Sequence, residues 1–218
     1  MPKRALVEHR PWLLAAAAAA IAFYFLRDNP IGGVWLILLK GSGVAFLAVY
    51  ALRRSPLPDA RILALVMALS ALGDMGIELT LELGGALFFA SHIAAMSLYL
   101  RNPRQEPSRS QKALAVSLLF AAPLVSWLVS DSWQIALYSL ALGGMAATAW
   151  MSRFPRYRVG IGAVMFVVSD WLIFAGQGSM AGSAFPNLMI WPLYFSGQFL
   201  IATGVVQTLR GEHPASGS

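Results

Sequence analysis

The sequence predicts an all-α integral membrane protein with eight transmembrane helices and with both termini in the cytoplasm. An apolar composition, eight apolar stretches and a one-sided distribution of basic residues predict this fold. The 218-residue chain is 58% hydrophobic and 12% charged, whereas a soluble globular domain is about 45–50% apolar and about 25% charged. This composition excludes an ordinary soluble domain and a disordered chain. Because the sequence has no cysteine, a disulfide scaffold and a Cys-ligated metal site are excluded too.

Eight stretches are apolar on all sides and approach the roughly 20 residues that a membrane helix needs. They are residues 12–26, 34–52, 62–79, 84–100, 113–129, 133–151, 159–175 and 187–209. The first is interpreted as a span and not as a signal peptide, because no small-residue cleavage site follows it. We expect residues 1–210 to form a single membrane domain and residues 211–218 to form a polar, mobile tail.

The basic residues predict the orientation of these spans. All but two of the 16 Lys and Arg residues lie before the first span, after the last, or in every second loop. The exceptions are Arg27, in an alternate loop, and Lys40, in the second span. The positive-inside rule therefore predicts cytoplasmic termini, in the inner (plasma) membrane if the host is bacterial. Since the net charge of +6 is explained by topology, we expect no nucleic-acid partner.

Polar side chains within the spans are the candidate functional residues, because they are costly in hydrocarbon and usually face a cavity or a partner. The predicted topology places them in the outer half of the membrane, so we expect one polar cavity that opens toward the non-cytoplasmic side. Asp74 and Asp170 lie at matching depth, roughly 8 Å from the outer ends of their helices, and are expected at its centre. The other members are Lys40, Glu78, His92, Tyr138, Tyr194 and Gln198.

Structural roles are open for most of these residues. Lys40 could form an ion pair with Asp74 or extend to the surface, and Glu78 could lie at the outer interface. The His, Tyr and Gln side chains could serve packing or interhelical hydrogen bonds. Residues 41–43 and 143–144 are small and are predicted to permit close helix contact. Six tryptophans near span ends are interpreted as an interfacial belt: Trp12, Trp35, Trp127, Trp133, Trp150 and Trp191.

Other chemistries lack their motifs. The sequence has no Gly-x-Ser-x-Gly elbow, no phosphate-binding loop and no His-Glu-x-x-His motif. Two of its three histidines, His9 and His213, lie in the tails. We therefore expect no metal and no organic cofactor.

Four stretches together resemble the YhhN-like lysoplasmalogenase family of integral membrane proteins. The resemblance runs from the second span to the eighth and departs at Gly41, where the family typically has proline. The adjacent Gly84 and Gly85 suit a tight turn that the family has there. The stretches are Lys40; Ser-Ala-Leu-Gly-Asp at 70–74 with Leu-Phe-Phe-Ala-Ser-His at 87–92; residues 162–171; and residues 194–201.

The resemblance implies hydrolysis of the vinyl ether bond of lysoplasmalogens, which gives a fatty aldehyde and glycerophosphoethanolamine or glycerophosphocholine. The substrate would be a lysophospholipid, and membrane lipids would surround the protein. This reaction requires an acid to protonate the β-carbon and a second carboxylate to stabilise the cation and activate water, as in glycosidases. We therefore expect Asp74 and Asp170 to be catalytic. The other six polar residues of the spans, from Lys40 to Gln198, are expected to bind substrate.

Functions from other classes remain open. A transporter is compatible with intramembrane acids and with the similar Leu-Gly-Asp at 72–74 and Val-Ser-Asp at 168–170, which hint at a four-helix repeat. A lipid-binding or sensor protein could use the same pocket without turnover. An intramembrane aspartyl protease is disfavoured because its Pro-Ala-Leu motif is absent. The sequence leaves the oligomeric state and the head-group preference open.

Overall fold

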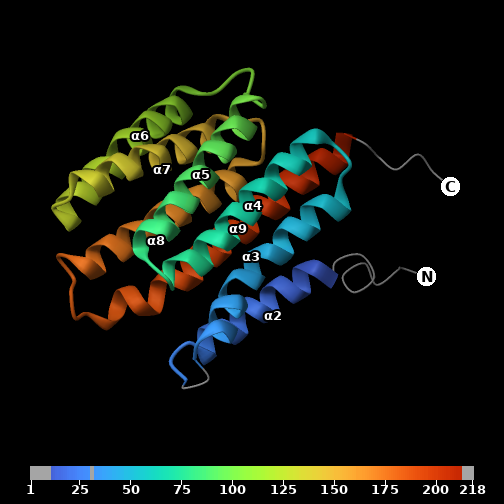
Figure 1. The fold of residues 1–218 in the computed structure, drawn as a ribbon. Helices are drawn as coiled ribbons and strands as arrows, with labels where there is room; N and C mark the ends of the chain where they lie inside the picture. Colours follow the sequence, from blue (N-terminus) through green and yellow to red (C-terminus); the bar gives the residue numbers. More distant parts are fainter. Residues whose placement is uncertain (1–10, 30–31, 213–218) are drawn as a thin grey trace. The chain divides into compact units, whose positions relative to one another are not determined.

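The computed structural model describes residues 11–29 and 32–212, and over these residues it is helical, with one short π-helical turn and no strand (Figure 1). Eight α-helices lie where the sequence predicts eight apolar stretches. They are α2 (Pro11–Leu26), α3 (Val34–Arg54), α4 (Pro58–Ile77), α5 (Leu81–Leu100), α6 (Arg109–Ser130), α7 (Trp133–Met151), α8 (Ile161–Gln177) and α9 (Ala184–Glu212).

Six of these helices are long and apolar enough to cross a membrane: α3, α4, α5, α6, α8 together with the turn before it, and α9. They indicate a multi-pass membrane protein. The 16 residues of α2 make a shorter apolar helix. α7 is not among the six, since glycine, glutamine and hydroxyl-bearing residues lower its hydropathy. Eight helices are confirmed, whereas eight crossings and the sidedness of the termini stay predictions.

Several helices begin earlier than the apolar stretches, because capping residues extend them into polar sequence. α4 begins at Pro58, a residue that suits the first helical position, and Asp59 follows in the first turn. α6 begins after Ser108, whose side chain accepts from the backbone N–H of Gln111, while Gln111 accepts from the backbone of Ser108. This reciprocal capping box satisfies two backbone donors that the helix leaves free.

The last two helices also differ from their predicted limits. A π-helical turn, η1 (Arg156–Gly160), precedes α8. α9 continues to Glu212 and contains Pro192. The first two residues of the predicted tail are therefore helical, and the rest of that tail, 213–218, lies outside the described residues.

The predicted glycine turn is wrong, because Gly84 and Gly85 lie within α5 and the chain turns before it, after Ile77. Gly84 has a different role. A Cβ at this position would lie 2.2 Å from Ile77 Cγ1 and 2.7 Å from its backbone nitrogen. Glycine therefore lets the start of α5 approach the end of α4, while Gly85 faces open space.

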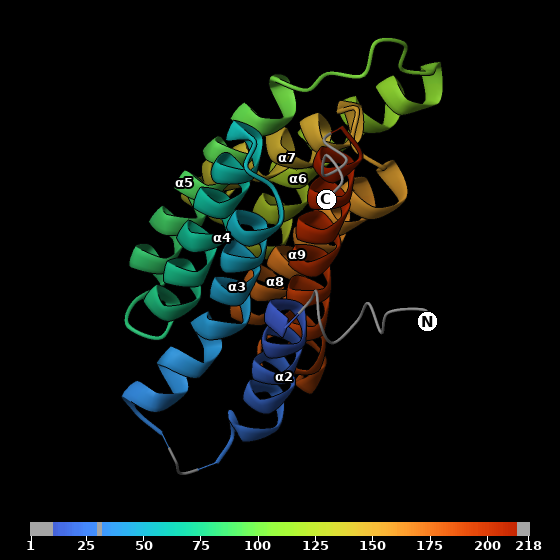
Figure 2. The same ribbon diagram turned by 90° about the vertical axis from the view of Figure 1, so that its right-hand side faces the viewer.

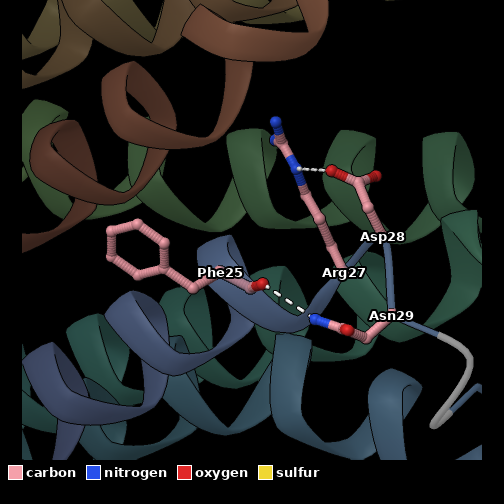
Figure 3. A network of polar contacts seen from close by, with 4 residues as sticks. All are labelled: Phe25, Arg27, Asp28 and Asn29. Carbon is pink, nitrogen blue, oxygen red and sulfur yellow. Dashed lines mark hydrogen bonds and ion pairs between the residues drawn. The ribbon is translucent and has the colours of Figure 1, made fainter.

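Polar contacts close the end of α2, where helix carbonyls lack intrahelical partners. The backbone nitrogen of Arg27 donates to Phe23 O at 2.9 Å, and the side-chain amide of Asn29 donates to Phe25 O at 3.2 Å (Figure 3). The Arg27 guanidinium lies 3.6 Å from Asp28 Oδ2 and 4.6 Å from the ring centre of Tyr24. These contacts accompany the end of α2 at Leu26, where the sequence turns from apolar to polar.

The chain falls into two compact parts, one up to Ser91 and one from His92, so the division lies within α5. In the first part α3 packs along both α2 and α4. In the second part α6 packs along α7 and α8 along α9, while α6 and α7 both contact α8 (Figures 1 and 2). The single domain inferred from the sequence stays a prediction.

Small residues bring the paired helices together, as the sequence predicts. A Cβ at Gly41 would lie 2.8 Å from Ala71 O, and one at Gly143 would lie 2.8 Å from Leu118 O. These distances are below any that real Cβ atoms show, so both positions require glycine for the α3–α4 and α6–α7 contacts. Gly41, which departs from the family pattern, thus has a packing role.

Candidate functional site

Three polar side chains form a hydrogen-bonded chain across α5, α7 and α8 in the second part. The Tyr138 hydroxyl donates to Asp170 Oδ2 at 2.9 Å. His92 Nε2 lies 3.0 Å from the same hydroxyl oxygen. His92 and Asp170 are only 1% and 5% exposed. The structure therefore brings together three residues that the sequence places on three different predicted spans.

The chain can exist in two proton arrangements, because the tyrosine hydroxyl carries a single proton. When Tyr138 donates to Asp170, its oxygen is free to accept from a protonated His92 Nε2. When Asp170 carries a proton and donates it to Tyr138, the hydroxyl can turn and donate to an unprotonated Nε2. Both forms satisfy all three groups, so Asp170 can hold or release a proton without leaving a buried partner unsatisfied.

Aromatic rings surround this chain on its apolar sides. The Phe166 ring lies 5.1 Å from His92 and 5.1 Å from Tyr194, with edge-to-face geometry in both contacts. The Phe174 ring lies 5.9 Å from Tyr138. Phe166 and Phe174 precede and follow Asp170 by one helical turn, which places them on its face of α8. Neither ring is among the residues predicted for the site, although a spacing of four residues on each side of Asp170 indicates a shared helix face.

The assignment of Trp191 to an interfacial belt is wrong. Its side chain is 5% exposed and packs against Tyr194, with ring centres 5.7 Å apart, and against Phe195. Position near a predicted span end misled the assignment, because α9 begins three residues before the predicted limit. Trp35 and Trp133 are strongly exposed, as belt residues would be.

Tyr194 and Gln198 lie one turn apart on α9, and both are buried. Tyr194 joins the aromatic surroundings through Phe166. Gln198 is 1% exposed, and neither its amide nitrogen nor its amide oxygen has a hydrogen-bond partner among the residues that the structure describes. Each such group costs about 1–3 kcal/mol relative to a satisfied one. The alternative that Gln198 serves an interhelical hydrogen bond is therefore not met among the described residues.

The first part buries its own carboxylate, Asp74, on α4, where it is 2% exposed. One turn earlier, Ser70 Oγ lies 2.8 Å from Ser91 Oγ, which itself donates to Val66 O at 3.0 Å. Gly73 lies against the Phe88 ring, since a Cβ there would be 3.0 Å from it. Asp74 is thus buried on α4 one residue after Gly73, where α4 packs closely against α5.

Lys40 pairs with Glu78, with 2.5 Å between Nζ and Oε1. Their side chains are 14% and 33% exposed, and Lys40 Nζ also lies 5.6 Å from the centre of the Phe23 ring. This pair joins α3 to the end of α4. The structure therefore gives Lys40 a different acidic partner from the one that the sequence suggested.

The structure thus groups the predicted residues into two sets, one in each part of the chain. The cavity predicted to unite them, with both aspartates at its centre, stays a prediction. An apolar groove of about 470 Å³ near Tyr99 and Lys112 holds none of these residues. Within residues 11–29 and 32–212 no group of three acidic or histidine side chains could hold a metal ion; His9 and His213 lie outside this region.

The fold and the site define a class: multi-pass helical membrane proteins with carboxylates and other polar side chains buried between apolar helices. The family model described as the YhhN family matches residues 35–205, and this chain belongs to that family. All eight predicted site residues lie within the matched region.

Two curated relatives are 30% identical to the chain over 178 residues, which is 76% of this chain and 68% of each relative. They are proteins of Mycobacterium bovis and Mycobacterium tuberculosis, and each is named lysoplasmalogenase. No solved structure matches the chain.

Proposed function

We propose that this protein is a lysoplasmalogenase that hydrolyses the vinyl ether bond of a lysoplasmenyl lipid to a fatty aldehyde and a glycerophospho-alcohol. The observation that carries the proposal is the buried Asp170, which accepts a hydrogen bond from Tyr138, whose hydroxyl is hydrogen-bonded to His92. Membership of the YhhN family and the lysoplasmalogenase relatives support the same reaction.

The chemistry begins with proton transfer from the Asp170 carboxyl group to the β-carbon of the vinyl ether. This step forms an oxocarbenium ion and leaves Asp170 as a carboxylate, which the Tyr138 hydroxyl stabilises by donation. Water then adds to the α-carbon and gives its extra proton to a carboxylate, which balances the proton that Asp170 donated. The hemiacetal collapses to aldehyde as its hydroxyl proton passes to the leaving glycerol oxygen. A positioned general acid contributes about 10²–10⁴-fold to such a rate.

The remaining roles follow from the hydrogen-bonded chain and from the sequence. His92 and Tyr138 can return a proton to Asp170 between turnovers, because the chain accommodates both protonation states. The second carboxylate, which stabilises the cation and activates water, is predicted from the sequence to be Asp74. Tyr194 and Gln198 would contact the substrate from α9, and Lys40 and Glu78 are proposed to bind its polar part.

The test is aldehyde release from a lysoplasmenyl lipid by the detergent-purified protein. Asp170→Asn keeps the size of the side chain and its acceptor oxygen but removes the acid. We expect it to lower kcat by about 10²–10⁴-fold, and we expect Asp74→Asn to be similarly impaired. Asp28→Asn is the matched control, since that carboxylate is exposed at the end of α2.

Full activity of Asp170→Asn would contradict the assignment of the acid. A folded wild-type protein that binds lysolipid but releases no aldehyde would contradict the proposed reaction and favour a lipid-binding or transport function. Thermal unfolding of each variant, followed in the same detergent, separates loss of chemistry from loss of structure.

A further inference from the structure

The apolar groove of about 470 Å³ lies wholly in the second part of the chain, between the end of α5, the first half of α6 and the last half of α7. Its volume is that of a site for one small molecule, about 300–1,000 Å³. Lys112 is the single charged residue on its walls. Apolar side chains from all three helices make up most of the rest, among them Leu100, Val116, Leu119 and Met151.

This groove has a polar end and an apolar end. Lys112 lies in the first turn of α6, and Val116 and Leu119 follow it along the groove. Leu119 is seven residues beyond Lys112, a rise of about 10 Å. α7 runs back along α6 after a two-residue connection, so its last residue, Met151, lies near the level of Lys112. A cation at one end and hydrocarbon over the remaining length complement an amphiphile with an anionic head and an apolar chain.

The Lys112 ammonium is available for such a head group. Its side chain is exposed, and it forms no ion pair with a carboxylate among the described residues. A lysine of this kind lays its carbon chain along an apolar surface and holds its charge at the interface. An anion at the polar end of the groove therefore has a free cation to contact.

Basic side chains also gather around the polar end. Residues 92–130 contain one acid, Glu106, against four basic residues, and residues 152–160 add three arginines and no acid. An excess of one sign attracts the opposite charge. If this end faces the cytoplasm, as the sequence predicts, it meets the leaflet whose anionic lipids attract basic segments. The basic residues are Arg101, Arg104, Arg109, Lys112, Arg153, Arg156 and Arg158.

Backbone contacts hold the polar end of the groove in place. Pro103, which lines the groove, forms an isolated β-bridge with Ser152. The backbone nitrogen of Arg104 donates to the carbonyl oxygen of Met151 at 3.0 Å. These contacts join the loop after α5 to the end of α7, so the two walls are fixed relative to each other. The groove is thus formed before a ligand enters, which lowers the entropic cost of binding.

We propose that this groove binds one anionic phospholipid, with an acyl chain against Val116 and Leu119 and the phosphate group at Lys112. The site is separate from the proposed catalytic function, because none of the eight predicted site residues lines it. A zwitterionic phospholipid offers the same chain, but its own ammonium group offsets the phosphate charge. A second copy of this chain fits less well, because docking on this face would bring like charges together.

The experiment measures lipid binding to the detergent-purified full chain by native mass spectrometry. Dioleoyl-phosphatidylglycerol and dioleoyl-phosphatidylcholine have identical acyl chains and differ in head-group charge. We expect one tightly bound phosphatidylglycerol, with a dissociation constant about 5-fold or more below that of phosphatidylcholine. One basic side chain near a lipid surface contributes about this factor. The wild-type comparison requires no variant.

Lys112→Gln removes the charge at the polar end and leaves the apolar walls intact. It should weaken phosphatidylglycerol binding about 5-fold and leave phosphatidylcholine binding unchanged. Arg210→Gln is the matched control, because it removes an exposed cation at the end of α9 that does not line the groove. It should change the affinity for neither lipid.

Val116→Trp fills the groove with a ring and keeps every charge. Val116 is 55% exposed, so the larger side chain does not overpack the core. We expect the tightly bound phosphatidylglycerol to be lost. Leu114→Trp is the matched control, since Leu114 is an exposed residue of the same helix that does not line the groove. It should bind phosphatidylglycerol as the wild type does.

Four results would overturn the inference. Equal wild-type affinity for the two lipids would show that head-group charge is not recognised, and equal losses in Lys112→Gln and Arg210→Gln would show a general effect of surface charge. Full binding by Val116→Trp would place the lipid elsewhere. A lipid-free dimer that Val116→Trp disrupts would assign the groove to a second copy of the chain. Each result leaves the proposed hydrolysis untouched, because aldehyde release tests that separately.

Discussion

At the scale of single residues, Asp170 is a buried carboxyl group that depends on hydrogen bonding to offset the cost of its burial. An isolated carboxyl group between apolar helices is costly. The Tyr138 hydroxyl offsets this cost by donating a hydrogen bond to Asp170, and it forms a second hydrogen bond with His92. Because Asp170 and His92 are both buried and both contact the Tyr138 hydroxyl, a change at Tyr138 affects both of its neighbours.

Tyr138→Phe tests this coupling. The variant keeps the ring and its contact with Phe174, but it removes both hydrogen bonds of the hydroxyl. We expect kcat to fall by about 10–10²-fold and the free energy of unfolding to fall by about 1–3 kcal/mol, because two buried groups lose a partner. Aldehyde-release kinetics and thermal unfolding in detergent measure the two effects.

Tyr157→Phe serves as the control, since Tyr157 is strongly exposed and its hydroxyl accepts a hydrogen bond from the neighbouring Arg156. It should change neither quantity measurably. If Tyr138→Phe turned over substrate at the wild-type rate, the hydroxyl would have no part in orienting the Asp170 carboxyl group or in returning a proton to it.

At the scale of elements, α8 and α9 form the contact that the site depends on. Gly162 and Gly197 face each other, and a Cβ on either would lie 2.6 Å from the backbone oxygen of the other. Backbone atoms cannot move aside as a flexible side chain can. The close approach therefore fixes the register of α8, which carries Asp170, against α9, which carries Tyr194 and Gln198.

Gly162→Ala is expected to force these helices apart. Overpacking of this kind costs about 1–3 kcal/mol, and we expect the free energy of unfolding to fall by that amount and kcat/KM to fall with it. Gly85→Ala on α5 is the matched control, because no atom lies within 4 Å of its added Cβ.

In the control variant, alanine in a helix should leave stability unchanged or raise it by up to about 1 kcal/mol. Both variants are compared by thermal unfolding. If the two alanines had the same effect, the close α8–α9 contact would not hold under the conditions of the assay.

At the scale of the whole molecule, the basic loops predict the orientation in the membrane. The loop between α5 and α6 and the turn before α8 carry many of the arginines. The two loops also hold each other: Arg153 Nε donates to Asn102 Oδ1 at 2.6 Å, and Arg104 donates to Phe154 O at 3.0 Å. This end of the second part is expected to face the cytoplasm.

Single cysteines can test the orientation cleanly, because the natural chain has none. Gln105→Cys places a thiol in the exposed α5–α6 loop, and Ser179→Cys places one in the exposed α8–α9 connection. In intact cells a membrane-impermeant maleimide should label Ser179→Cys and should label Gln105→Cys only after permeabilisation. The reverse pattern would refute the predicted sidedness.

The helical class and the positions of the helices follow from the amino-acid pattern alone. The free-energy cost of exposing these apolar stretches to water does not depend on which neighbouring helices they contact. The sequence also singled out Asp74 and Asp170, since a carboxyl group far from a span end has no route to water. Helix limits shifted where local capping, as at Pro58 and Ser108, extended a helix into polar sequence.

Which polar residues contact each other depends on how the helices pack. Tyr138 is 32 positions from Asp170 and 46 from His92, and no local pattern encodes such a contact. The same holds for the pairing of Lys40 with Glu78, for the burial of Trp191, and for the Gln198 amide, which has no partner among the described residues. These features depend on the register and close approach of packed helices, which arise from many contacts at once.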